Sequence, residues 1–227
     1  MDFVFAQDLG KLADYHGQVL IQTKLQVKSR MEAVRQWGLD GDAEVMWPKM
    51  VVRWINRKQC SYPDLIEETK IRLSDPILVN NVIHLVDATG VGVPTIDFMR
   101  ESGLNPLGIW ITGGSQAGTN TTGLTVPKVE LINALQLALD SNMIEFAQGL
   151  KEETLKQLLH EFSTFKEKKT QKTGAKTYEA WRESDHDDLI LALAMAVWWI
   201  LRTVGINTIQ HRRLQTENDY DPLRNGL

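Results

Sequence analysis

The chain has 227 residues, of which 43% are apolar and 24% charged, a composition typical of a soluble globule with one large domain. Its formal charge of −4 argues against generalised polyanion binding, so contact with nucleic acid requires a local basic patch. The single cysteine, Cys60, excludes an internal disulfide and a multi-cysteine zinc site. We expect no leader at Met1, no transmembrane segment and no internal repeat, and hence a cytoplasmic protein.

The N-terminal part predicts strands first. An apolar run over residues 3–7 ends in Asp8-Leu9-Gly10, and the alternating residues 17–27 predict its hairpin partner. Residues 28–48 predict a helical turn around 31–37 and then loop. We expect further strands at residues 49–56, 82–86 and 107–112, and helices at residues 62–73 and 94–102, the second closed by Gly103.

From Gly113 onward, predicted helices alternate with predicted strands. Residues 113–123 predict a Gly-rich loop, and Pro127 opens a helix. An edge strand (143–147), a helix (151–162) and a lysine-rich hairpin (165–181) follow. We expect one domain over residues 1–204 and a loose polar tail over 205–227. The whole order predicts an α/β fold with a mixed sheet of five or more strands and helices on both faces.

The last predicted helix begins near His186 and has acids at its start. Ser184 is a candidate N-cap, and Asp185, Asp187 and Asp188 suit the positive end of the helix dipole. No residue from Leu189 to Leu201 is polar, so this helix is expected in the core, and it is shorter than the roughly 20 apolar residues of a membrane span. Taken singly, such an acidic start indicates only a capped helix.

Asp8 and Asp87 share a position at the carboxyl end of an apolar strand, before a glycine-bearing turn. Either one alone is ordinary turn chemistry. If the first and fourth strands are parallel neighbours, however, both carboxylates lie at the sheet edge where open α/β sheets place their sites, and Asp187 and Asp188 can reach them. Such repelling acids favour Mg²⁺ or Mn²⁺, and two ions roughly 4 Å apart support phosphodiester cleavage.

Four segments resemble a known family. They are VDATGVGVPTIDFMRESGL (86–104), ITGG (111–114), VPK (126–128) and TYEAWRESDHDDLILALAMAVWW (177–199). Together they are similar to the nuclease domain of tailed-phage large terminase subunits, over about residues 3 to 204. The resemblance implies an RNase H-like fold and a two-metal endonuclease that cuts double-stranded DNA during genome packaging in a phage-infected or prophage-bearing host.

By position, the resemblance assigns the metal-binding and catalytic acids to Asp8, Asp87 and the pair Asp187 and Asp188, and it leaves open which of that pair is the direct ligand. A terminase ATPase, the small terminase subunit and the portal protein are the implied partners. The chain departs from the full-length family pattern, because no G-x-x-x-x-G-K-[ST] loop occurs in it. It is thus an excised domain, a fragment or a stand-alone nuclease, and only the cutting function carries over.

Several further residues are candidates for supporting roles. His186 is a general base, a ligand or a stabiliser of a neighbouring acid, although a histidine beside a helix cap is more often structural. Lys128, at a helix start, indicates a phosphate or carboxylate partner, although a solvated lysine is nearly as common there. Glu161 and Glu183 are candidate additional acids near the site, but their spacing in the sequence does not assign them to it. The densest basic run suits DNA phosphates, and it comprises Lys166, Lys168, Lys169, Lys172 and Lys176.

Three other functions compete with this hypothesis. Asp8-Leu9-Gly10 also resembles the first phosphate loop of actin-like and sugar kinases, but the chain is too short for the two halves which that architecture needs. Another RNase H-like nuclease, such as a resolvase or transposase core, differs in the DNA structure it cuts. A non-catalytic packaging or docking module would be indifferent to divalent metal ions.

Overall fold

The structure is a computed structural model that describes residues 1–10, 14–28, 45–89, 92–114, 116–119, 123–169, 176–180 and 187–218. Within these ranges only the backbone is described at residues 27–28, 45–47, 92, 166–169, 176–180 and 205–218. The predicted helical turn at 31–37 lies outside the described residues, as do Lys172, Glu183, Ser184, Asp185 and His186.

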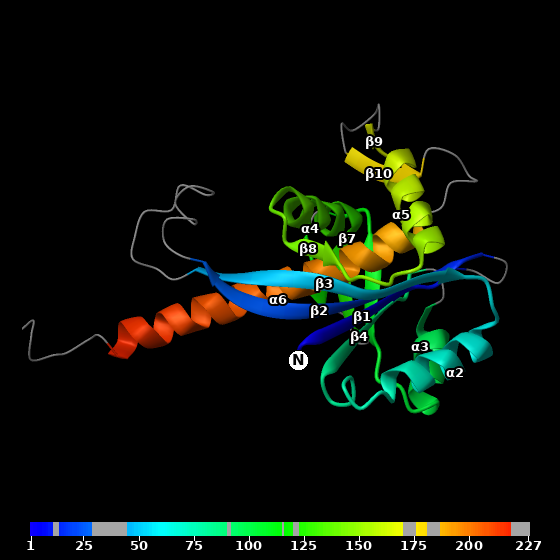
Figure 1. Cartoon of the computed structure of the whole chain (residues 1–227), viewed down its shortest axis with the longest axis horizontal. Coiled ribbons are helices and arrows are strands. Elements are labelled where there is room, and N and C mark those ends of the chain that lie inside the picture. The colour runs from blue at the N-terminus through cyan, green and yellow to red at the C-terminus, as the bar shows by residue number, and fades with distance from the viewer. Residues whose placement is uncertain are drawn as a thin grey trace, which may run out of the picture.

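One mixed sheet forms the centre of the molecule (Figure 1). In the described part of the chain it has eight strands in the order β6-β7-β5-β4-β1-β2-β3-β8, and β1 pairs antiparallel with β2 and parallel with β4. The strands are β1 (Phe3–Asp8), β2 (His16–Lys28), β3 (Val45–Lys58), β4 (Val82–Asp87), β5 (Leu107–Thr112), β6 (Gly118–Thr119), β7 (Gly123–Pro127) and β8 (Ile144–Phe146).

Helices cover both faces of this sheet, as the sequence predicted. Figure 1 shows α2 and α3 on one side and α4, α5 and the long α6 on the other. A separate two-stranded hairpin, β9 with β10, lies beside α5. The helices and the hairpin strands are α2 (Tyr62–Leu73), α3 (Gly92–Glu101), α4 (Lys128–Asp140), α5 (Glu152–Thr164), α6 (Asp188–Asn218), β9 (Phe165–Lys169) and β10 (Lys176–Ala180).

Alternation along β1 sorts its side chains between the two faces. Val4 and Ala6 belong to the large core formed with α4, α5 and α6, whereas Phe3 and Phe5 pack on the other face. Because side chains alternate with a period of two along a strand, Asp8 shares the face of Val4 and Ala6. The first acid therefore points toward the layer that contains α6.

The opposite face of β1 carries a buried chain of polar side chains. Nε2 of His84 lies 2.7 Å from Oε1 of Gln7, and Nε2 of Gln7 donates to Oγ1 of Thr69 at 3.0 Å. Burial lowers the pKa of His84 to about 3, so its imidazole is neutral and donates to Gln7. These bonds fix α2 on the strands that end in Asp8 and Asp87.

Three predicted elements differ in the structure. The loop predicted over residues 113–123 contains β6 and is followed by β7, a strand whose last residue, Pro127, precedes α4. Helix α6 begins at Asp188 and continues to Asn218, so the tail predicted from Gly205 is helical up to that residue. Proline has no backbone N–H group, and the first residues of a helix need none for bonds within the helix. Pro127 is therefore compatible either with the end of a strand or with the start of a helix. The division into a 1–204 domain and a tail stays a prediction.

Among the described residues, no helix is both long enough and apolar enough to cross a membrane.

Candidate metal-binding and catalytic site

Asp8 and Asp87 lie side by side at the carboxyl ends of parallel neighbours β1 and β4. Gln7 pairs with Val86 in the ladder, so the next residue on each strand is an aspartate. Both residues are largely buried, with exposed fractions of 8% for Asp8 and 9% for Asp87, and the charge of Asp87 raises the pKa of Asp8. Oδ1 of Asp87 also accepts from the backbone N–H of Thr89 at 2.8 Å, a turn that ends the strand. Asp8 and Asp87 therefore lie next to each other at this edge of the sheet, as the sequence predicted.

The first turn of α6 brings two further acids to this edge. The carbonyl oxygen of Asp187 accepts the N–H of Leu191 at 2.9 Å, which places Asp187 at the N-cap position and Asp188 inside the helix. The charges of both residues act on Asp8 and raise its pKa. Four carboxyl groups from β1, β4 and α6 therefore converge, although they are far apart in sequence.

Two basic side chains hold the acids of α6. Nζ of Lys128, the first residue of α4, lies 2.7 Å from Oδ2 of Asp187. Nε of Arg57, from β3, lies 3.2 Å from Oδ2 of Asp188, and its guanidinium stacks 4.2 Å from the centre of the Tyr15 ring. The carboxylate partner that the sequence indicated for Lys128 is thus Asp187, whereas Arg57 had no sequence signal.

Glu161 of α5 is the most deeply buried acid of the group, with 1% of the residue exposed. Its Oε2 accepts the backbone N–H groups of Leu189 and Ile190, both at 3.0 Å. Its Oε1 lies 3.9 Å from Nε of Arg57 and has no hydrogen-bond partner among the described residues. Glu161 therefore caps α6 from another helix.

A glycine allows α6 to approach the sheet at this point. Gly17 of β2 pairs with Asp8 on one side and with Arg57 on the other, so the three residues form one row across the sheet. A Cβ at residue 17 would overlap the backbone carbonyl of Asp188 and come within 3.0 Å of its Cβ. Only a residue without a side chain fits here.

Burial and mutual repulsion raise the pKa values of these acids. Burial raises the pKa of Asp8 well above its usual range, and the charge of Asp87 raises it further. Burial also raises the pKa of Asp87, while its hydrogen bonds to Thr89 lower it. The pKa of Asp188 rises to about 7 by burial in spite of Arg57, and that of Glu161 rises to about 8. Each value shows that negative charge here lacks compensation.

The residues fit a divalent cation by their chemistry. Carboxylate oxygens are the ligands that Mg²⁺ and Mn²⁺ prefer, and buried carboxylates with raised pKa values gain from a nearby positive charge. Within the described ranges, no three His, Cys, Asp or Glu residues are already arranged as a metal site. The Oδ2 atoms of Asp187 and Asp188 instead face Lys128 and Arg57.

The predicted DNA-binding lysines lie in the hairpin beside this site. Lys166, Lys168 and Lys169 belong to β9 and Lys176 to β10, and the backbones of Lys169 and Lys176 pair. Their side chains are outside the description. Phe165, the first residue of β9, places its ring 5.7 Å from Nζ of Lys128, so the base of the hairpin adjoins the acidic site.

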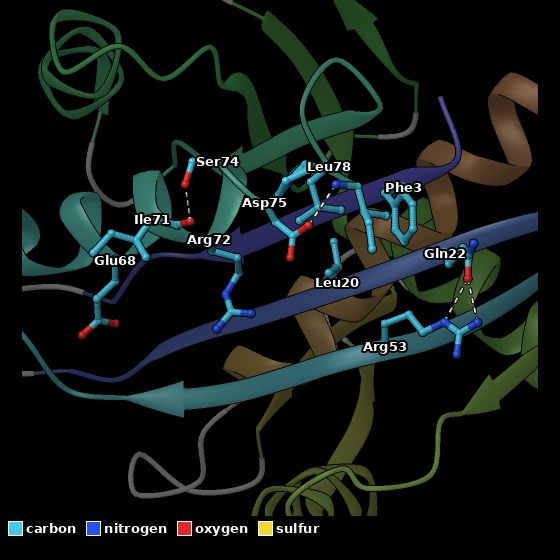
Figure 2. A pocket seen from close by; sticks show the side chains of 12 residues that line it. Phe3, Leu20, Gln22, Arg53, Glu68, Ile71, Arg72, Ser74, Asp75 and Leu78 are labelled. Carbon is cyan, nitrogen blue, oxygen red and sulfur yellow. Dashed lines mark hydrogen bonds between the residues drawn. The ribbon is translucent and has the colours of Figure 1, made fainter.

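A cavity of about 910 Å³ lies elsewhere, at the amino end of β1 (Figure 2). Phe3, Leu20 and Leu78 line it together with Arg53, whose Nη2 donates to Oε1 of Gln22 at 2.7 Å. Asp8 is at the other end of the same strand. The cavity is therefore separate from the acids and contributes no residue to them.

Comparison with known proteins agrees with this architecture. No protein-family model and no curated protein matches the sequence. The crystal structure of the large terminase nuclease from thermophilic phage G20c is similar, with a TM-score of 0.54 and 16% identity over 86% of this chain and 80% of that one. The Mn-soaked terminase nuclease domain of human cytomegalovirus gives a TM-score of 0.44 and 12% identity over 87% and 83%. The protein therefore shares the fold of that terminase nuclease structure, a mixed sheet with helices on both faces, and this confirms the fold expected from the sequence motifs.

Proposed function

We propose that this protein is a metal-dependent endonuclease that hydrolyses phosphodiester bonds of double-stranded DNA, as the nuclease part of a phage packaging terminase. One observation carries the proposal: Asp8 and Asp87 emerge side by side from β1 and β4, and the acidic first turn of α6 contacts Gly17, the residue that pairs with Asp8. Four carboxyl groups close together repel one another, which is unfavourable unless a cation compensates their charge. Capping of turns alone does not require such a cluster.

In this proposal Asp8, Asp87 and one or both of Asp187 and Asp188 hold two Mg²⁺ or Mn²⁺ ions. When bound, such ions lower the pKa of a water molecule and stabilise the attacking and leaving oxygens of an in-line displacement. The protein supplies fixed carboxylates on rigid strand ends and excludes bulk water by burying them. His186, which comes directly before Asp187 in the sequence, keeps its predicted role as a general base, a ligand or a stabiliser of a neighbouring acid.

DNA binding is assigned to Lys128 and to the lysines of the β9–β10 hairpin. A chain of net charge −4 needs a local basic surface to approach DNA phosphates. The hairpin supplies Lys166, Lys168, Lys169 and Lys176 next to the acids, and Lys172 lies in the segment between its two strands. Phosphate contacts of this kind carry no base information, so we expect cleavage of low sequence specificity.

The direct test is a plasmid-cutting assay with Mn²⁺, Mg²⁺ or a chelator. Asp8→Asn and Asp87→Asn should abolish metal-dependent cutting while the fold, followed by circular dichroism, survives. Asp140→Asn is the matched control, because Asp140 is exposed at the far end of α4 from Lys128. If both site variants cut as fast as the parent, the assignment is wrong.

The same assay separates the competing functions. Preference for a four-way junction over duplex plasmid would favour a resolvase, and indifference to metal in both cutting and melting temperature would favour a docking module. The terminase ATPase, the small subunit and the portal protein are the partners that belong to this proposal. Co-purification with them tests the packaging role separately from the chemistry.

A further inference from the structure

We propose that Glu161 is a positioning residue of the acidic site. It caps the first turn of α6 and thereby determines the positions of the carboxylates of Asp187 and Asp188. The inference deepens the proposed nuclease function and rests on it. Glu161 touches neither Asp8 nor Asp87 in the described contacts, so its effect passes through the backbone of α6 and through Arg57.

The cap is a long-range contact. The first N–H groups of any helix lack partners within the helix and are usually capped by a side chain just before it. Here one oxygen of Glu161, 28 and 29 residues away in sequence, accepts the N–H groups of Leu189 and Ile190. A local cap would fix only the direction of the chain, whereas a cap from α5 also fixes the height of α6 over the sheet.

Arg57 links this cap to the sheet. Its Nε binds Oδ2 of Asp188 at 3.2 Å and lies 3.9 Å from Oε1 of Glu161, and both side chains are largely buried. Within the part of the chain that the structure describes, the Nη2 atom of Arg57 and Oε1 of Glu161 have no hydrogen-bond partner. The hydrogen-bonding capacity of Arg57 and Glu161 is thus incompletely satisfied, which is typical of a site arranged for a function rather than for stability alone.

Small displacements of α6 matter because metal coordination is strict. One residue of helix rise is about 1.5 Å, whereas ligand distances in a metal site hold within about 0.2 Å. Loss of the cap frees the first turn to fray or shift, and the carboxylates of Asp187 and Asp188 move with it. Metal affinity should fall even though the strand acids stay in place.

Three variants test the inference, with Mn²⁺ binding to the folded protein measured by calorimetry or electron paramagnetic resonance. Glu161→Ala should weaken Mn²⁺ binding by about tenfold or more, the usual effect of losing an outer-shell partner. Glu161→Gln replaces only the unpartnered oxygen and should bind Mn²⁺ within about threefold of the parent, since one amide oxygen still accepts both N–H groups. Leu158→Ala, also buried on α5, is the control for general destabilisation and should keep the parent affinity.

The outcomes separate this inference from the proposed function. If the parent binds Mn²⁺ and Asp87→Asn abolishes cutting, the nuclease proposal holds. Glu161→Ala binding Mn²⁺ like the parent, or Leu158→Ala losing as much affinity as Glu161→Ala, would then overturn the positioning role alone. A Glu161→Gln variant as weak as Glu161→Ala would also overturn it, because the cap would not be the cause.

Discussion

Gly17 and Asp188 are in contact through their backbones: the Cα of Gly17 on β2 faces the carbonyl group of the first residue of α6, with no room for a side chain between them. Gly17 also lies between Asp8 and Arg57 in the strand ladder. The spacing between the sheet acids and the helix acids is therefore set by the absence of one methyl group.

Gly17→Ala should push the start of α6 away from the sheet. Inserting a methyl group into a packed contact is destabilising by about 1–3 kcal/mol, and here the displaced atoms belong to the residue that carries a site carboxylate. We expect a lower melting temperature and weaker Mn²⁺ binding. Thermal unfolding and metal titration measure the two effects on one preparation.

Gly118→Ala is the matched control for that substitution. A Cβ at residue 118 would meet no atom within 4 Å, so stability and Mn²⁺ affinity should stay at the parent values. Equal metal affinity in Gly17→Ala and Gly118→Ala would show that α6 tolerates displacement.

Without divalent ions, stability should fall as pH rises from about 7 to about 9, by about 2 kcal/mol. The pKa values of Asp188 and Glu161 are raised to about 7 and about 8, so the folded protein binds protons that the unfolded chain has released. A carboxyl group whose pKa is raised in the folded protein contributes its full stabilisation at pH values below its pKa in the unfolded chain. This contribution to the free energy of unfolding is lost as the pH rises through the pKa of the folded state.

Urea unfolding in chelator over this pH range measures the decline. Glu161→Gln keeps the cap and cannot ionise, so it should remove more than half of the pH dependence. Mg²⁺ should also reduce it, by stabilising the ionised acids. A parent whose stability rises with pH would contradict the buried state of these carboxyls.

Lys128→Met should separate metal binding from DNA binding. The ammonium of Lys128 and a divalent cation compete for Oδ2 of Asp187, so Mn²⁺ affinity should be equal to the parent or tighter. Affinity for duplex DNA should fall uniformly across sequences, and the slope of log affinity against log salt should decrease by about 1. Fluorescence anisotropy with labelled duplexes in chelator tests this, and unchanged salt dependence would remove Lys128 from the DNA-binding surface.

Local signals predicted much of the fold. The helix over residues 62–73 has the predicted bounds because Ser61 caps it and Pro63 occupies its first turn. Asp8 and Asp87 were found from their strand-end positions alone, and the parallel pairing of β1 and β4 then brought them together. These features depend on short stretches of sequence and on one rule of sheet geometry.

Features that depend on register were missed. Arg57 pairs with Gly17 in a part of the ladder that a bulge between Leu20 and Ile21 separates from the rest of β2 and β3, and no periodicity in the sequence reveals that register. Strand β7 was not predicted, because its few residues lie between the predicted Gly-rich loop (113–123) and the helix expected from Pro127. The partner of Glu161 is the backbone of another helix, so no sequence spacing could identify it.

The long helix α6 has a consequence for how the molecule is made. Asp8 is among the first residues of the described chain and the acidic turn of α6 is near its end, so the group of carboxyls does not exist until the final helix has docked. A form of the chain without that helix lacks Asp187 and Asp188 beside Asp8 and Asp87, and it leaves the two strand aspartates more exposed to water. Docking of α6 is thus the folding step that assembles the four carboxyl groups.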